Sequence, residues 1–344
     1  MIFKRVLISN FLFILSSIAL LGIAAPSSTA AIGTVAEPPK NIKGWHHIFA
    51  LLKEKGVDEE RLLDIFSDER MPEYAPLQFK VKPNEKHLTK NYKKRNSHQE
   101  RANAFEFYTT HKKHFLEAER KYGVLASIML AILQIETKCG QVTGDAIAFH
   151  RLSRLATATS RDSIEESYDI NLKERPETTM EDVEKRAKKL EDIFLPQVVA
   201  TIRLADLNGV HPLDIKGSYA GAIGYPQFLP NNVFVYGVDG NNDGAIDLYN
   251  PIDAIHSVGN FLKQHGWKKK NYTKEEKEKL ILYYNRSTPY AQTVVAMAST
   301  LSSMMAGKPN PKDAPPKAKK KGQNAKKAGG TAKTVATKQG QKKK

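Results

Sequence analysis

The chain has 344 residues, of which 41% are hydrophobic, and carries a formal net charge of +16 with a single cysteine, Cys139. This length allows two domains or one large one, and the hydrophobic content is sufficient for a buried core. One cysteine excludes an intrachain disulfide, so stability has to come from packing. No base stands near Cys139 in the sequence, and we expect a small buried side chain there rather than a nucleophile.

The N-terminal segment has the layout of a secretory signal peptide. Two basic residues precede an apolar run from Val6 to Ala25, and small residues follow that run. We therefore predict a signal peptide over residues 1–30, export to the periplasm or cell envelope, and no transmembrane segment in the mature chain. The apolar run is nearly long enough to span a bilayer, so an uncleaved membrane anchor is the alternative.

Residues 31–120 show helical patterning without a chemical motif. Apolar residues from Trp45 to Leu52 recur on one helical face, and residues 101–121 are predicted to form a helix leading into the next element. Prolines and lysines between about 71 and 95 predict an extended connection. We interpret this part as an accessory helical region, either plain scaffold or a contributor to a cleft.

Residues 124–135 contain only two polar side chains, Ser127 and Gln134, which is typical of a buried helix. The run is too short to cross a bilayer. It ends on Glu136, so a carboxylate lies at the edge of the predicted core. Burial should raise the pKa of that carboxylate, as a general acid requires. The alternative is a glutamate that is solvated or paired with a lysine.

Charged residues of both signs fill the stretch from about 160 to 189, which predicts a charged insertion, either a solvated helix pair or a flexible segment. An apolar helical pattern resumes over residues 190–207. The segment 217–230 is rich in Gly, Ala and aromatic residues, and Gln227 and Phe228 add an amide and an apolar face. This combination suits an N-acetylated sugar, and a tightly packed turn is the alternative.

Residues 239–247 fit the first nine places of an EF-hand-like calcium loop. Side-chain oxygens stand at the first, third and fifth places and a backbone carbonyl at the seventh, from Asp239, Asn241, Asp243 and Ala245. The final place departs from the pattern, because Asn250 replaces the bidentate glutamate. An Asx-rich turn without an ion is the alternative.

The C-terminal residues 307–344 carry most of the net charge, with thirteen lysines and one acid, Asp313. The segment has almost nothing to bury, which predicts a disordered tail. We expect it to attract anionic envelope polymers by charge alone, and a solubilising role is the alternative. We expect no specific nucleic-acid partner, because an exported protein would seldom meet one.

Three motifs in order resemble those of the lytic murein transglycosylases of the MltB type. They are Glu136-Thr-x-x-Gly140 and the segments 217–230 and 284–291, and the resemblance runs from about residue 40 to about 305. It implies an α+β, predominantly α-helical, lysozyme-like catalytic domain over residues 121–306. It also implies that an aspartate, here Asp253, closes the calcium loop over 239–253. Sugar contacts are implied for Ser218, Gln227, Phe228, Tyr284, Asn285 and Tyr290.

The resemblance implies cleavage of the β-1,4 bond between N-acetylmuramic acid and N-acetylglucosamine in peptidoglycan, leaving a 1,6-anhydromuramic end. No cofactor is implied for catalysis, and calcium would be a structural ion. Ordinary glycoside hydrolysis uses two carboxylates, whereas these motifs offer only Glu136. A water-using muramidase or chitinase-like hydrolase, or a non-catalytic peptidoglycan-binding protein on the same fold, are the alternatives.

Overall fold

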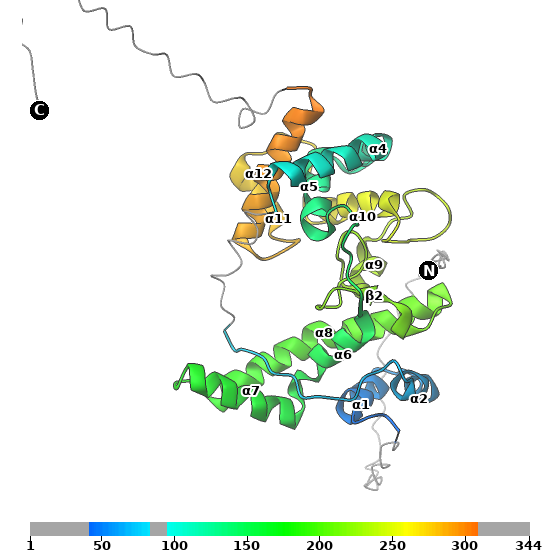
Figure 1. The fold of residues 1–344 in the computed structure, drawn as a ribbon, viewed down its shortest axis with the longest axis vertical. Coiled ribbons are helices and arrows are strands. Elements are labelled where there is room, and N and C mark those ends of the chain that lie inside the picture. The colour runs from blue at the N-terminus through cyan, green and yellow to red at the C-terminus, as the bar shows by residue number, and fades with distance from the viewer. Residues whose placement is uncertain (1–40, 83–94, 309–344) are drawn as a thin grey trace, which may run out of the picture. The chain divides into compact units, whose positions relative to one another are not determined.

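A computed structural model describes residues 41–82 and 95–308 of the chain (Figure 1). The predicted signal peptide and the lysine-rich tail lie outside the described residues. Within them no helix combines the length and the apolar character needed to cross a membrane. The described helices are α1 (His46–Glu54), α2 (Glu59–Ser67), α4 (His98–Tyr122), α5 (Ala126–Thr137), α6 (Ala148–Ala156), α7 (Arg161–Glu174), α8 (Met180–Asn208), α9 (Pro230–Tyr236), α10 (Pro251–Gln264), α11 (Lys274–Ile281) and α12 (Thr288–Met305).

Helix α5 lies at the centre of the larger hydrophobic core. Every residue of α5 is buried except Glu136, as its apolar sequence predicted. Helices α4, α10 and α12 pack around it (Figure 1). Helix α4, most of which belongs to the expected accessory region, therefore shares a hydrophobic core with α5 of the expected catalytic domain. The Glu119 carboxylate caps α5 by accepting a hydrogen bond from the Ala126 amide at 3.0 Å.

A second hydrophobic core joins α1 and α2 to α6 and α8. Trp45 is 1% exposed there, and its indole nitrogen donates to the Pro72 carbonyl oxygen at 2.7 Å. Helix α8 continues across residue 190, where the charged insertion was expected to end. A capping box formed by Thr179 and Asp182 starts this helix, and Gly209 in a left-handed conformation ends it.

The charged stretch from 160 to 189 forms α7 and the first part of α8, which confirms the helical alternative. The prediction that this stretch is solvated is wrong for one face of α7, where three polar side chains at intervals of four residues are buried. Backbone amides of three alternate residues in the extended segment 77–81 donate to these side chains. The pairs are Leu77 to Ser163, Phe79 to Ser167 and Val81 to Asn171, at 2.9, 3.1 and 2.9 Å. We call this arrangement the polar ladder.

Strand content in the described residues is small. Strands β1 (Ala146–Ile147) and β2 (Lys216–Gly217) pair antiparallel, and two short 3-10 helices, Thr157–Thr159 and Pro212–Asp214, complete the regular structure. This pairing needs glycine: a Cβ on Gly144, whose φ is +93°, would lie 2.2 Å from the Gly217 carbonyl oxygen. The two strands therefore fix the start of the glycine-rich segment beside the loop that follows α5.

Candidate active site

Glu136 is the half-buried end of an otherwise buried helix, and two groups act on its carboxyl. The Tyr290 hydroxyl, at the start of α12, donates a hydrogen bond to Glu136 Oε1 at 2.6 Å. The Arg95 guanidinium contributes positive charge, and its Nη1 donates to the Ile135 carbonyl oxygen at 2.7 Å. The carboxyl is therefore positioned by α5 and oriented by α12.

The environment raises the pKa of Glu136 from 4.5 to about 7. Burial is the largest cause, because it disfavours the ionised carboxylate. The hydrogen bond from Tyr290 and the charge of Arg95 both lower the pKa, but they do not offset the burial. A carboxyl with a pKa near neutrality can donate a proton and take one back at physiological pH.

Two tyrosines lie close to Glu136. The rings of Tyr284 and Tyr290 are nearly parallel, with an interplanar angle of 6° and 6.5 Å between centroids. The Tyr284 hydroxyl donates to the Pro226 carbonyl oxygen at 2.5 Å, which ties this ring to the glycine-rich segment. Burial, together with the charge of Glu136, holds the pKa of Tyr284 well above its ordinary value, so its phenol stays neutral.

The glycine-rich segment 217–230 is held by internal hydrogen bonds. The Ser218 amide donates to the Ala222 carbonyl oxygen at 2.8 Å, and the Ser218 hydroxyl accepts from the Ala222 amide at 3.2 Å. Gln227 has a left-handed φ of 51°, and its side-chain amide donates to the carbonyl oxygens of Thr143 and Gly224, each at 3.1 Å. The segment is therefore a packed turn, and its sugar contacts stay a prediction.

The loop after Glu136 and the glycine-rich segment are locked together. The Thr137 hydroxyl donates to the Tyr225 carbonyl oxygen at 2.9 Å and accepts from the Gly140 amide at 3.0 Å. Gly140 packs so closely on Tyr225 that a Cβ there would lie 1.9 Å from the ring. The spacing of threonine and glycine in the Glu-Thr-x-x-Gly motif thus has a structural cause, since both residues contact Tyr225.

The predicted site residues do not all have the same relation to Glu136. Tyr290 contacts it directly, and the charge of Glu136 contributes to the raised pKa of Tyr284. Phe228 is 3% exposed and packs behind Tyr284, with 5.9 Å between ring centroids. Asn285, next to Tyr284 in sequence, is half-buried, as are Ser218 and Gln227.

Arg95 is the residue of this site that sequence reasoning missed. It precedes α4, in the part of the chain interpreted as accessory, and no motif marks it. Only the three-dimensional structure brings its guanidinium to the end of α5. Cys139, in contrast, is buried as expected: its thiol donates to Gln134 Oε1 at 3.2 Å, and burial raises its pKa.

The acidic loop over residues 239–253 folds around oxygen atoms. Asp239 and Asn241 accept hydrogen bonds from backbone amides within the loop, and both oxygens of Asp253 accept amides, from Gly240 at 2.9 Å and Asp247 at 2.8 Å. Asp253 is fully buried, and burial raises its pKa to about 6, with further repulsion from Asp239 and Asp243. Carboxylate and amide oxygens, the side-chain groups that this loop carries, are the hard ligands that a calcium ion prefers.

The sequence model of the transglycosylase SLT domain family matches residues 43–278 of the chain. The chain therefore belongs to that family. The sequence is 31% identical over 167 residues to membrane-bound lytic murein transglycosylase B of Escherichia coli K12. That alignment covers 48% of this chain but only 38% of the relative.

Solved structures show the fold. The Escherichia coli lytic transglycosylase Slt35, determined in complex with bulgecin A and with calcium, has a TM-score of 0.57 at 21% identity, covering 78% of this chain and 95% of that chain. Pseudomonas aeruginosa SltB3 in complex with NAG-NAM-pentapeptide has a TM-score of 0.56 at 17% identity, covering 77% and 80%. The predominantly helical, lysozyme-like fold that the three motifs implied is therefore confirmed.

Proposed function

We propose that the protein is a lytic transglycosylase that cleaves the β-1,4 bond between N-acetylmuramic acid and N-acetylglucosamine in peptidoglycan. The observation that carries the proposal is Glu136, a single carboxyl with a pKa near 7 at the edge of a buried helix. Among the described residues the side chains that shift its pKa are Tyr290 and Arg95, and neither is an acid. A mechanism with one carboxyl agrees with this arrangement better than one with two.

In the first step the protonated Glu136 donates its proton to the bridging glycosidic oxygen, and the bond from that oxygen to the anomeric carbon breaks. The acetamido oxygen of the muramic residue supplies electrons to the anomeric carbon as the bond breaks. Glu136 is left as a carboxylate. The Tyr290 hydroxyl already donates to this carboxyl and stabilises the charge that develops on it.

In the second step the Glu136 carboxylate removes the proton from the C6 hydroxyl of the same muramic residue. The C6 oxygen then attacks the anomeric carbon, displaces the acetamido oxygen and closes the 1,6-anhydro ring. Glu136 regains its proton, so the enzyme ends the cycle in its starting state. A pKa of about 7 suits both proton transfers, because neither the protonated nor the ionised form of the carboxyl is strongly disfavoured near neutral pH.

The sugar contacts follow from the positions of the motif residues. Ser218, Asn285 and Gln227 supply polar groups at half-buried positions, and the half-buried ring of Tyr284 supplies a flat surface. Tyr290 is 1% exposed, so the expected sugar contact of its ring is wrong, and its hydroxyl acts through Glu136 instead. Flat aromatic faces pack well against sugar rings. Because Phe228 is buried behind Tyr284, we propose that it supports that ring.

The test is mass spectrometry of purified peptidoglycan sacculi treated with the protein. The proposal predicts muropeptides with anhydromuramic ends, each lighter than the hydrolysed equivalent by one water. Products with reducing ends would instead assign a water-using hydrolase. Absence of any soluble product from sacculi or chitin would assign a binding protein that keeps the groove without the reaction.

The hydroxyl of Tyr290 should control the pH range of the reaction. Its hydrogen bond lowers the pKa of Glu136, so Tyr290→Phe should raise that pKa further above 7. The protonated carboxyl starts the reaction, and the alkaline limb of kcat/KM should therefore move to higher pH, by roughly 0.5–1 unit. Tyr236→Phe removes a phenol elsewhere in the core and should leave the profile in place. A profile unchanged by Tyr290→Phe contradicts the assigned role.

We propose that the loop of Asp239, Asn241, Asp243, the Ala245 carbonyl and Asp253 binds calcium as a structural ion. The spacing of carboxylate and amide side chains along the loop and the raised pKa of Asp253 support this proposal. Bound calcium would neutralise the acids that repel one another at the start of α10. These residues take no part in the proposed reaction, and catalysis itself needs no cofactor.

Calcium should stabilise the protein more at pH 7.5 than at pH 5. The pKa of Asp253 is about 6 in the folded state and 3.8 ordinarily, so without calcium stability falls as pH rises through this interval. At a hundredfold excess over Kd, calcium should add about 2.7 kcal/mol, or roughly 5–10 °C in Tm. Asp243→Ala should abolish this shift, whereas Asp169→Ala, an exposed control on α7, should keep it. A parent Tm that does not respond to calcium contradicts the site.

We propose export to the periplasm or cell envelope, where peptidoglycan is the partner, with the lysine-rich tail attracting anionic polymers. The relative in Escherichia coli is described as membrane-bound, which is consistent with an envelope location.

A further inference from the structure

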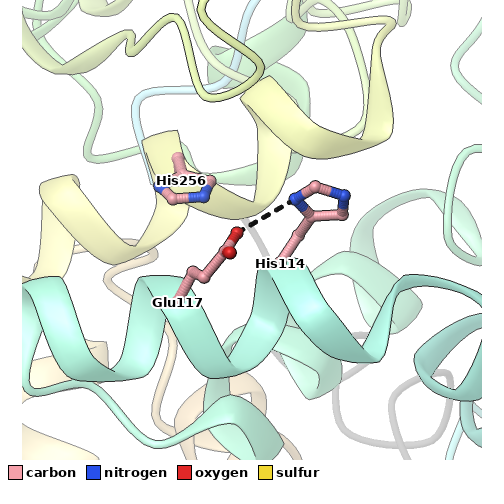
Figure 2. A group of neighbouring side chains, drawn as sticks. All are labelled: His114, Glu117 and His256. Atoms are coloured by element: carbon pink, nitrogen blue, oxygen red, sulfur yellow. Dashed lines mark ion pairs between the residues drawn. The ribbon is translucent and has the colours of Figure 1, made fainter.

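Three side chains of types that bind metal ions come together from the C-terminal half of α4 and from α10, and none of them belongs to the candidate active site (Figure 2). His114 and Glu117 lie one turn apart on α4, and His256 lies on α10, which packs against α4. Each residue offers one ligand atom, and these atoms all lie within 4.8 Å of one another. It is the one His, Cys, Asp and Glu group of this kind in the described residues.

The ring nitrogens of this cluster are poorly satisfied by the protein. His256 is 5% exposed, and its Nε2 is buried without a hydrogen-bond partner, while Nδ1 lies 3.4 Å from the Tyr122 hydroxyl. His114 Nδ1 is also buried without a hydrogen bond, 3.3 Å from Glu117 Oε2. A buried polar atom without a partner costs about 1–3 kcal/mol, which a bound cation would offset.

The neighbours of the cluster suit a bound metal ion. The Tyr122 hydroxyl can hold the Nδ1 ring nitrogen of His256, as the outer partners of metal-bound histidines do. Glu117 supplies a negative charge, which Lys113 approaches only at 4.0 Å.

We propose that His114, Glu117 and His256 form a binding site for a divalent transition-metal ion of the zinc type. Two imidazoles and one carboxylate select such an ion over calcium, which takes oxygen ligands. The side chains of His114 and Glu117 are 27% and 34% exposed, so water has access to the remaining coordination position. A metal here would cross-link α4 to α10, two helices that both pack against the Glu136 helix.

The experiment is a Zn²⁺ titration of the untagged full-length protein by calorimetry, with Co²⁺ absorption spectra to report nitrogen ligands. The parent should bind one Zn²⁺ at this site and gain thermal stability from it. His114→Gln and Glu117→Gln, both at half-exposed positions, should each weaken binding by at least about tenfold. Glu106→Gln makes the same charge change on an exposed part of α4 and should bind as the parent does.

Two outcomes overturn the proposal. One is a parent that binds no Zn²⁺ saturably, or binds it equally well after both ligand substitutions. The other is a loss of Zn²⁺ binding in Asp243→Ala, which would place the ion in the oxygen-rich loop. Retention of Zn²⁺ binding in Asp243→Ala, with its loss in Glu117→Gln, supports the site and separates it from calcium.

Discussion

Glu136→Gln is expected to reduce turnover of peptidoglycan by at least about 10²- to 10⁴-fold, because the amide can neither give nor accept the proton. The substitution preserves the shape of the side chain, and Tyr290 can still donate to the amide oxygen. Binding of glycan strands should therefore persist. The measurement is release of soluble muropeptides from sacculi, with pelleting on sacculi to report binding. Residual turnover above about a tenth of the parent's would move the catalytic role to another residue.

The same substitution should stabilise the fold in alkaline solution. The folded-state pKa of Glu136 is about 7 and its ordinary value is 4.5, so the folded protein holds its proton more tightly than the unfolded chain. Stability therefore falls as pH rises from about 4.5 to 7, by on the order of 2 kcal/mol, and Glu136→Gln removes this loss. Its Tm should exceed that of the parent at pH 8 but not at pH 4. Equal melting temperatures of the parent and the variant at pH 8 would contradict the raised pKa of Glu136.

Gly140→Ala should have the largest effect on stability. Gly140 has a φ of +89°, where an L side chain is strained, and its new Cβ would lie 1.9 Å from the Tyr225 ring. Strain of about 1–2 kcal/mol and overpacking of about 1–3 kcal/mol together predict a loss of roughly 2–5 kcal/mol. Thermal unfolding should report a Tm lowered by roughly 5–15 °C.

Gly266→Ala is the matched control for this effect. Gly266 has a nearly identical φ of +93°, but a Cβ there would meet no atom within 4 Å. Its substitution should cost only the backbone strain, about 1–2 kcal/mol. If the two variants lost equal stability, the contact between Gly140 and Tyr225 would contribute nothing beyond the backbone conformation.

The centre of the fold was predictable because its signal is local. A run of apolar residues determines that α5 is buried, and Glu136 follows that run directly, so both the core and its carboxylate could be predicted from adjacent residues. The family motifs extended the prediction to Tyr284 and Tyr290, which are separated from Glu136 by about 150 residues in the chain.

The parts that escaped prediction depend on partners distant in sequence. Arg95 has no motif of its own, and only tertiary packing brings it to Glu136. Ser163 and Ser167 look solvated in a highly charged stretch, yet they are buried because the backbone of a remote segment donates to them. The group of His114, Glu117 and His256 likewise exists only because α10 packs on α4.

The polar ladder has a consequence for hydrogen exchange. The amides of Leu77, Phe79 and Val81 are bonded to α7, whereas the hydrogen bonds found in the described residues include none from the amides between them. A segment outside any helix or strand should therefore show protection that alternates residue by residue, a pattern usually associated with an edge strand. Because the acceptors lie on α7, these three amides should exchange together when the segment detaches. Their common rate then reports how often the connection leaves the helix.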